Sequence, residues 1–268
     1  MAQISILGCG WLGLPLAQHL IEQGYRVKGS TTSPHRISEL KHAGIEAFVI
    51  VLSVDETSGS ADAFLADSTV LIIDIPPKLR ADNSESFFEK IKTFIQTKVI
   101  NSTIKKVLFI SSTSVYGEEP ILITEKSIEK PETLSGKELL QTEHFLEKQT
   151  AFKTTILRFG GLVGPNRHPA KSLAGKMNIA LPNAPINLIH QNDCIAIIST
   201  LLENEVWGEK WNAVTPFHPN RKEYYAAKAK EFGLEPPHFE TNDASGKIID
   251  SSKLMASLNY SFMHKEGI

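Results

Sequence analysis

Residues 4–13 of the chain read ISILGCGWLG, in which a short apolar run leads into three glycines spaced G-x-G-x-x-G. Gly8 allows a tight turn at this point, and Gly10 lets another group approach the backbone closely. Gly13 allows the helix that follows to pack against the strand that precedes it. The stretch is therefore typical of a turn that holds the pyrophosphate of a dinucleotide at the N-terminus of a helix.

The residues after the glycines supply the context that this motif requires. Apolar residues recur three or four positions apart through residues 14–21, which predicts an amphipathic helix that ends at Gly24. Residues 25–31 then predict a second strand. The alternative is that the glycines only pack a strand against a helix. The predicted cofactor site at this turn consists of Gly8, Gly10, Trp11, Leu12 and Gly13.

The composition is that of an ordinary globular chain of 268 residues, 41% of them hydrophobic and 22% charged. Its formal net charge of -2 gives no electrostatic basis for binding nucleic acid or an anionic membrane, so we expect a small-molecule partner. No apolar run reaches the roughly 20 residues that a membrane helix needs, and no export signal is evident. Cys9 and Cys194 have no Cys or His nearby at metal-ligand spacing. We therefore expect a cytoplasmic protein with two reduced thiols and no metal site.

Strand and helix patterns alternate along most of the chain. Beyond the opening unit, the predicted strands are residues 45–52, 69–75, 106–112, 154–159 and 211–214. The predicted helices are residues 34–43, 62–66, 84–98, 134–149, 192–203 and 219–232. Short Val-, Ile- and Leu-rich strands between helices indicate an α/β fold of the Rossmann type, a doubly wound parallel sheet covered on both faces.

The regularity fades from about residue 160, where four prolines interrupt the chain between residues 165 and 185. We therefore expect an NAD(P)-binding Rossmann domain over residues 1–160. Residues 161–268 are expected to form a smaller substrate-binding lobe that is interleaved with the first and does not fold independently. Helices on the outer faces of the sheet could pair two chains, so a homodimer is an alternative to a monomer.

The end of the second predicted strand bears on which dinucleotide binds. An NAD site usually has Asp or Glu there, about 20 residues beyond the glycines, to bind the ribose 2′-hydroxyl. Residues 28–36 read KGSTTSPHR and contain no acid. They offer hydroxyl groups and a guanidinium to a 2′-phosphate, which favours NADP(H) over NAD(H). The residues assigned to this role are Thr31, Thr32, Ser33 and Arg36, with the alternative that Arg36 is only a solvated helix residue.

Three segments in the second half of the chain resemble one family in the same order. Residues 109–117 read FISSTSVYG, residues 157–165 read LRFGGLVGP, and residues 187–193 read NLIHQND. Together they resemble the extended short-chain dehydrogenases/reductases, the NAD(P)-dependent sugar epimerase/dehydratase family. The first 50 residues also look like the start of a 6-phosphogluconate or hydroxyisobutyrate dehydrogenase, so they do not decide the family.

The resemblance implies a catalytic hydroxyl at Ser112. In that family a tyrosine transfers a proton to or from the substrate oxygen, and a lysine four residues later lowers the pKa of that tyrosine. The helix predicted at residues 134–149 places Ser135 and Leu139 at these two positions, so the usual Tyr-x-x-x-Lys pair is missing. Lys137 lies two residues before position 139. On a helix this spacing rotates its side chain about 200° away from the direction that a side chain at position 139 takes.

Two tyrosines are candidates for the missing proton donor. A literal Tyr-x-x-x-Lys runs from Tyr224 to Lys228, but it follows the strands of the sheet and reads as a packing helix. Tyr116 is the better candidate, because it follows Ser112 at the mouth of the predicted cleft. The alternative is that Tyr116 packs within its loop or lines the substrate site.

Further polar and apolar residues are assigned to the site from their places along the chain. Pro76, Ser111 and Phe159 join the predicted cofactor site at the ends of strands. Arg167, which could bind a carboxylate or phosphate, is assigned to the substrate together with His168 and His190. His190 and Asp193 also suit a junction between lobes or a helix cap, with Asn192 or Asp193 at the N-cap position.

These observations favour an NADP(H)-binding oxidoreductase or epimerase-like protein that acts on a small carbonyl or sugar-like substrate. Its proton relay is non-standard, with catalytic roles expected at Ser112 and Tyr116. One alternative is a non-catalytic regulator or sensor that binds NADP(H). Another is a 6-phosphogluconate-type dehydrogenase, which would need a long helical second domain that the proline-rich segment does not suggest.

Overall fold

The first strand, the glycine turn and the first helix follow one another as the sequence predicts. The computed structural model describes residues 2–77, 85–119 and 121–265. Strand β1 (Gln3–Leu7) is buried along its whole length and leads into the glycine turn. Helix α1 (Gly13–Glu22) and strand β2 (Arg26–Thr31) lie within one residue of their predicted bounds.

The described residues build an eight-stranded sheet with the order β11-β8-β6-β5-β1-β2-β3-β4. Besides β1 and β2 it contains β3 (Glu46–Leu52), β4 (Thr57–Gly59), β5 (Val70–Ile73), β6 (Lys106–Ser112), β8 (Lys153–Phe159) and β11 (Lys210–Ala213). All neighbours pair in parallel except β3 with β4. From β1 the chain extends the sheet in one direction to β4, and from β5 it extends the sheet in the opposite direction, so the strand order reverses between β1 and β5. Ligands of such sheets bind at this switch point, outside the carboxyl ends of the strands.

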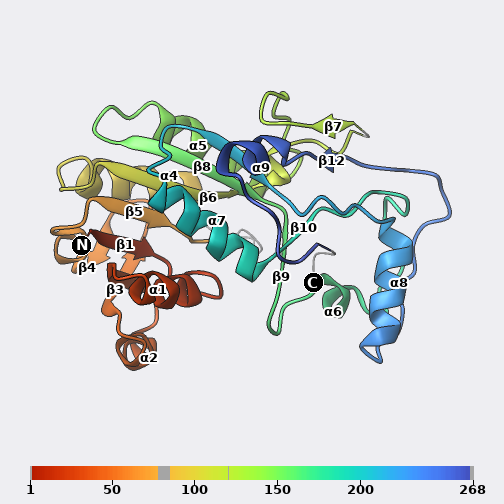
Figure 1. Cartoon of the computed structure of the whole chain (residues 1–268), viewed down its shortest axis with the longest axis horizontal. Helices are drawn as coiled ribbons and strands as arrows, with labels where there is room; N and C mark the ends of the chain where they lie inside the picture. The colour runs from red at the N-terminus through yellow and green to blue at the C-terminus, as the bar shows by residue number, and fades with distance from the viewer. Residues whose placement is uncertain (1, 78–84, 120, 266–268) are drawn as a thin grey trace.

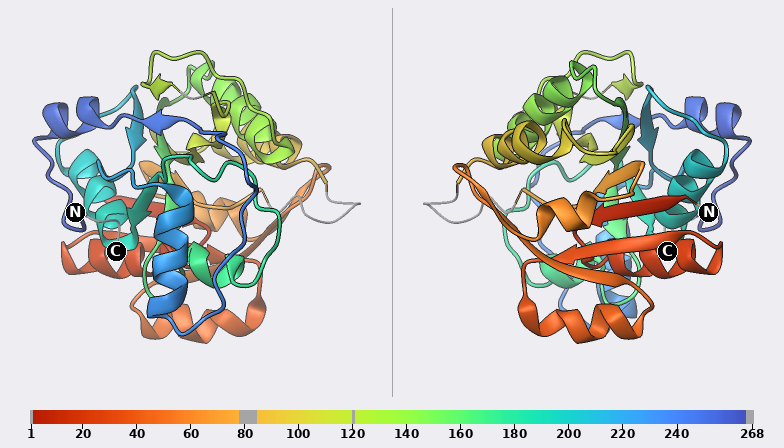
Figure 2. Two further views of the ribbon diagram at one scale, coloured as in Figure 1. Left: turned by 90° about the vertical axis from the view of Figure 1, so that its right-hand side faces the viewer. Right: turned by 90° about the vertical axis from the view of Figure 1, so that its left-hand side faces the viewer.

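Helices cover both faces of this sheet (Figures 1 and 2). On one face, apolar residues of α1, α7 (Gln191–Glu203) and α9 (Ser252–Leu258) form one core. On the other, α3 (Ala61–Leu65), α4 (Phe87–Phe94) and α5 (Leu134–Glu147) form a second. Shorter helices are η1 (Pro34–Arg36), α2 (Ile37–His42), η2 (Ile95–Val99) and η3 (Thr113–Val115). The fold is thus the doubly wound α/β fold that the sequence predicts.

A smaller lobe lies beyond the carboxyl ends of the strands, where α6 (Pro169–Leu173) and α8 (Arg221–Glu231) stand apart from the main sheet (Figure 1). Strands β9 (Gly161–Val163) and β10 (Leu188–His190) pair in parallel and lead into this lobe. Strands β7 (Leu122–Ile123) and β12 (Ile248–Ile249) form a second small sheet. Because α7, β11 and α9 return to the main sheet, the chain passes between the two lobes several times.

The elements that the sequence did not predict are short. They are β4, η3, β7, β9, α6, β10, β12 and α9, each of seven residues or fewer. The helix predicted at residues 84–98 begins at Phe87 and continues as a π-helical turn, and residue 84 lies outside the described residues. Short elements carry too few residues for a periodic pattern, so their positions follow from tertiary packing.

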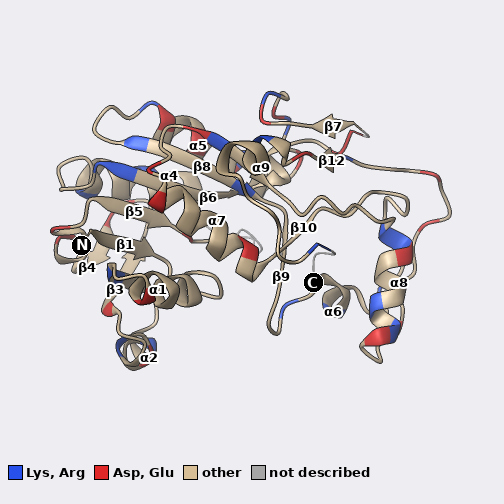
Figure 3. Ribbon diagram, viewed as in Figure 1, with Lys and Arg blue, Asp and Glu red and all other residues tan. Residues whose placement is uncertain are grey.

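Acidic and basic residues are interspersed along the surface elements, and α8 carries both signs (Figure 3). Within the described residues, no helix is both long enough and apolar enough to cross a membrane. The same part of the chain contains no group of three or more His, Cys, Asp or Glu side chains that could hold a metal ion. Cys9 and Cys194 are buried, and neither forms a disulfide in this structure.

Candidate functional site

The glycine turn has no room for side chains at two of its three glycines. Gly8 has a φ of +108°, and a Cβ there would lie 2.3 Å from the carbonyl oxygen of Asp74. A Cβ on Gly13 would lie 2.2 Å from the carbonyl oxygen of Gly8. At Gly10 a Cβ would meet nothing within 4 Å, so the backbone there is open to an approaching group. This cradle at the start of α1 fits a dinucleotide pyrophosphate.

A pocket of about 670 Å³ extends from this turn along the carboxyl ends of the strands. Ten predicted cofactor residues line it, namely Gly8, Gly10, Trp11, Leu12, Thr31, Thr32, Arg36, Pro76, Ser111 and Phe159. Two others do not: Gly13 lies beneath the turn, and the backbone N–H of Ser33 donates to Oγ1 of Thr31 at 3.2 Å. Ser112 and Arg167 also line the pocket.

The segment from the end of β2 to η1 presents hydroxyl groups and the cation of Arg36 to the pocket. The guanidinium of Arg36 donates from Nη1 to the carbonyl oxygen of Cys9 at 2.9 Å and from Nε to Glu39 at 2.8 Å. These contacts hold it against the glycine turn. Two carboxylates line the pocket, Asp74 and Glu118, and neither lies on β2.

Asp74, directly after β5, is an ionisable group beneath the glycine turn that sequence reasoning missed. Burial raises the pKa of its carboxyl group to about 8, although the backbone N–H of Gly13 and the charge of Arg167 both act to lower it. The group is therefore largely neutral at pH 7. A neutral carboxyl group does not repel the anionic pyrophosphate that the turn would hold.

Trp11 joins the glycine turn to the smaller lobe. Its indole N–H donates to the carbonyl oxygen of Pro165 at 3.0 Å, and its own carbonyl oxygen accepts from the side chain of Gln191 at 2.6 Å. The guanidinium of Arg167 lies over the indole, 4.9 Å from the ring centroid. Arg167 is thus held at the edge of the pocket, between the two lobes.

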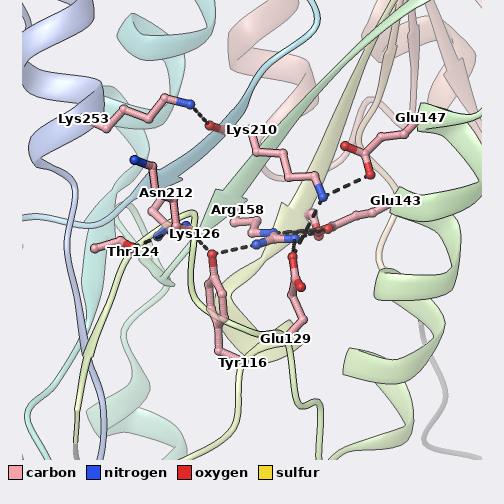
Figure 4. Close-up of polar contacts among 11 residues, drawn as sticks. Tyr116, Thr124, Lys126, Glu129, Glu143, Glu147, Arg158, Lys210, Asn212 and Lys253 are labelled. Carbon is pink, nitrogen blue, oxygen red and sulfur yellow. Dashed lines mark hydrogen bonds and ion pairs between the residues drawn. The ribbon is translucent and has the colours of Figure 1, made fainter.

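The structure corrects the prediction for Tyr116, which does not line the pocket. Its side chain is 1% exposed, and its hydroxyl accepts from Arg158 at 2.6 Å and donates to Asn212 at 3.0 Å (Figure 4). Burial raises the pKa of Tyr116, partly offset by Arg158. The side chain that the sequence placed at the mouth of the cleft is therefore part of the interior.

Arg158 is the centre of this buried network (Figure 4). Its guanidinium is fully buried and pairs with Glu143 of α5 and with Glu129, the latter at 2.8 Å. Burial acts to lower the pKa of Arg158, but the hydrogen bonds and charge of Glu143 outweigh it and raise the pKa. Ser111 donates to the same Glu143 at 2.5 Å, so its hydroxyl is committed to the network. The neighbouring Ser112 lines the pocket, and its Oγ accepts from the backbone N–H of Ser114.

His168 and His190 also lie outside the lining of the pocket, contrary to their assignment to the substrate. Each imidazole caps a helix: Nδ1 of His168 accepts from the first turn of α6, and Nδ1 of His190 from that of α7, both at 3.1 Å. His190 therefore holds the N-cap position that the sequence gave to Asn192 or Asp193. Asp193 instead accepts from the backbone N–H groups of Met263 and His264 and fixes the C-terminal segment.

The literal Tyr-x-x-x-Lys on α8 lies away from the pocket, as expected. Tyr224 belongs to the core of the smaller lobe, and Lys228 pairs with Glu231 at 2.7 Å. On α5, Leu139 lines the pocket beside the end of β6. The position at which the family resemblance would require a lysine therefore carries an apolar side chain that faces the site.

Comparison with known proteins agrees with this architecture. Residues 3–103 match the NAD binding domain of 6-phosphogluconate dehydrogenase. The whole chain aligns with Protein YeeZ of Escherichia coli K12, with 32% identity over 273 residues that cover 100% of this chain and 98% of the relative. The chain belongs to the YeeZ family.

Solved structures extend the likeness in fold beyond the YeeZ family. UDP-glucuronic acid 4-epimerase from Bacillus cereus, in complex with NAD, superposes with a TM-score of 0.77 at 20% identity and covers 97% of this chain and 93% of its own. A short-chain dehydrogenase/reductase superfamily protein from Agrobacterium tumefaciens with bound NAD gives a TM-score of 0.75 at 16% identity, covering 99% and 94%. The fold of this YeeZ-family chain is thus that of NAD-binding epimerases and reductases over nearly its full length.

Sequence reasoning also missed two charged residues of the pocket, Glu118 and Lys247. Nζ of Lys247 donates to Glu118 at 2.9 Å and to the carbonyl oxygen of Tyr116 at 3.0 Å. Glu118 and Tyr116 are both far from Lys247 along the sequence, so no motif spacing links Lys247 to them. The one available signal in this YeeZ-family chain is Asn187, the first residue of the NLIHQND segment, whose side chain binds the backbone of Lys247 and Ile249.

Proposed function

We propose that this chain is an NADP(H)-dependent oxidoreductase or epimerase-like enzyme that acts on a small carbonyl or sugar-like substrate. The observation that carries the proposal is the continuous pocket, which joins the open cradle at Gly10 to the hydroxyl of Ser112 at the end of β6. Residues 1–160 would supply the dinucleotide site, and residues 161–268 most of the substrate lobe. When bound, the nicotinamide supplies or accepts the hydride.

The preference for NADP(H) over NAD(H) rests on the end of β2. A 2′-phosphate there would meet the hydroxyl groups of Thr31 and Thr32 and the guanidinium of Arg36, which the carbonyl of Cys9 and Glu39 already orient. An oriented guanidinium binds phosphate with little further loss of side-chain freedom. No acid at this strand end is available to accept hydrogen bonds from a ribose 2′-hydroxyl.

The chain's own residues would bind and orient the substrate. Ser112 would donate a hydrogen bond to the reacting oxygen while the backbone N–H of Ser114 holds its Oγ in place. Arg167, positioned over Trp11, offers its guanidinium to a phosphate or carboxylate of either the substrate or the dinucleotide. Phe159 and Leu139 supply apolar walls that limit water.

Oxidation of NADPH, followed by absorbance with a panel of small aldehydes, ketones and keto sugars, tests this function. We expect turnover with at least one carbonyl compound, and a fall in kcat of about 100-fold or more in Ser112→Ala. Ser172→Ala removes an exposed hydroxyl of α6 outside the pocket and serves as the matched control. Turnover that survives Ser112→Ala unchanged would contradict the role of Ser112.

A second function is favoured by one specific observation. Tyr116 is buried in an ionic network, and α5 carries Ser135 and Leu139 where the resemblance implies a tyrosine and a lysine. A protein that retained the cofactor pocket without this relay would suit a regulator or sensor of NADP(H). Selective binding of NADP(H) with no turnover across the carbonyl panel would favour this alternative.

A further inference from the structure

The proposed enzyme needs a group that transfers a proton to or from the substrate oxygen. α5 does not provide one at the expected position, since Leu139 is apolar and faces the pocket. Tyr116 does not provide one either, because its hydroxyl is sequestered by Arg158 and Asn212. A proton donor for this site must therefore come from another element.

Lys247 brings an ammonium group into the same pocket from the segment before β12. Its side chain is 7% exposed, whereas that of its partner Glu118 is 46% exposed. A lysine ammonium has three N–H groups. Among the described residues, two of them have acceptors, on Glu118 and on the carbonyl of Tyr116. The third can donate to a ligand in the pocket.

The surroundings fix both members of this pair. The side chain of Asn187 accepts from the backbone N–H of Ile249 at 2.9 Å and donates to the carbonyl of Lys247 at 3.0 Å, so the backbone beneath the ammonium is anchored. The backbone N–H of Glu118 donates to Glu132 at 3.0 Å. A Cβ on Gly246, the residue before Lys247, would lie 3.1 Å from Cβ of Ala184, so the backbone at this point packs closely against that residue.

The sheet itself sets the path of a bound dinucleotide: its adenosine half lies toward β2 and its pyrophosphate at the switch point beside Gly10. Its other half must then extend toward the ends of β6 and β8. Ser112 ends β6 and lines the pocket, and so does Lys247, which binds the carbonyl oxygen of Tyr116 four residues after Ser112. A substrate placed next to the nicotinamide would therefore meet the ammonium of Lys247.

We propose that Lys247 is the proton donor and acceptor for the substrate oxygen, with Glu118 holding the ammonium and connecting it to solvent. The inference rests on the proposed function. In the reducing direction, the carbonyl carbon gains a hydride from the reduced nicotinamide dinucleotide, which is oxidised. Lys247 breaks one N–H bond and passes the proton to the carbonyl oxygen, giving an alcohol. The resulting neutral amine regains a proton from water through Glu118, and the oxidising direction reverses each step.

Nitrogen-15 NMR of lysine side chains tests the location without relying on turnover. The Nζ signal of Lys247 is assigned by its loss in Lys247→Arg. We expect saturating NADP to shift this signal, and 2′-phospho-ADP-ribose, which lacks nicotinamide, to shift it much less. Lys253 is the matched control, because it also binds one glutamate and one carbonyl, at 2.9 and 2.8 Å, but lies outside the pocket lining.

Kinetics with a carbonyl substrate test the chemical role. Lys247→Arg keeps the charge and the donors for Glu118 and Tyr116, but an arginine does not release its proton in a protein. We expect kcat to fall by about 10²- to 10⁴-fold with little change in KM. Glu118→Gln is expected to lower kcat less, again with KM retained. Lys253→Arg should leave both constants unchanged.

The outcomes separate this inference from the proposed function. Binding of the dinucleotide with identical effects of NADP and 2′-phospho-ADP-ribose on Lys247 would overturn the inference and leave the cofactor site intact. Full turnover in Lys247→Arg would also overturn it, because a purely structural lysine tolerates this exchange. Failure of every dinucleotide to bind would overturn the proposed function, and the inference with it.

Discussion

At the scale of single residues, the site combines groups that a motif reveals with groups that only the folded chain brings together. The sequence predicted the position of Gly8, Gly10 and Arg36 in the pocket, because each is close along the chain to the other residues of the glycine turn or of the end of β2. The position of Lys247 could not be predicted in this way, since it lies 131 residues from the carbonyl that it binds. Tyr116 was misassigned because its spacing from Ser112 carries no information about the buried Arg158 that captures its hydroxyl.

Asp74 makes the stability of the ligand-free protein depend on pH. Its pKa is about 8 in the folded state and 3.8 as an ordinary aspartate, so the folded state binds more protons between these values. The free energy of unfolding should therefore decrease as pH rises from about 4 to 8. Urea unfolding at several pH values should show this slope in the wild type and a shallower one in Asp74→Asn. Parallel curves for the two proteins would contradict the assignment.

Thr31 lies where an NAD site would carry an acid. Thr31→Asp places a negative charge beside the expected 2′-phosphate, so the affinity for NADPH should fall about tenfold or more relative to that for NADH. Thr31→Asn, which adds no charge, is the matched control. Dissociation constants from titration of dinucleotide fluorescence provide the measurement. An unchanged ratio of the two constants in Thr31→Asp would refute the NADP(H) assignment.

At the scale of elements, α5 is fastened to the sheet by an ion pair instead of by apolar packing alone. Glu143 of α5 and Arg158 of β8 are both fully buried, and this attachment fixes the helix against β6 and β8. Leu139 is thereby set one helical turn away, at the wall of the pocket. The sequence predicted the long strands and α5 from their periodicity, but the pairing of β7 with β12 depends on contacts between distant segments.

Removing one member of this pair should cost far more than removing both. Glu143→Leu leaves the guanidinium of Arg158 buried with an incomplete set of partners, which should lower the free energy of unfolding by about 3–5 kcal/mol. The double variant Glu143→Leu, Arg158→Met should recover much of that loss. Denaturant unfolding of both variants measures the difference. Equal losses in the single and double variants would show that the pair acts through packing only.

At the scale of the whole molecule, the two lobes meet at the glycine turn. Trp11 is held by Pro165 and Gln191 and is covered by Arg167, so the residue between two cofactor glycines is also a contact between lobes. Repeated passage of the chain between the lobes strengthens this connection. We therefore expect dinucleotide binding at the turn to be coupled to the position of the loop after β9.

Substitution of Gly164 tests the coupling between the glycine turn and the loop after β9. A Cβ there would lie 3.1 Å from the indole of Trp11 and 3.0 Å from Cβ of Gln191, at a φ of +154°. Gly164→Ala should displace Trp11 and weaken dinucleotide binding by several-fold to about tenfold. Gly208→Ala is the control for backbone strain, since it has a φ of +90° and no atom within 4 Å of the added Cβ. Equal dinucleotide affinity in the two variants would argue against the coupling.

A thermal-shift titration with NADPH, NADP, NADH and NAD tests the claim that the glycine turn and the end of β2 form an NADP(H) site. A ligand at 100 times its dissociation constant adds about 2.7 kcal/mol of stability. We expect NADPH and NADP to raise Tm at lower concentrations than NADH and NAD. A Tm that none of the four dinucleotides changes would contradict the claim.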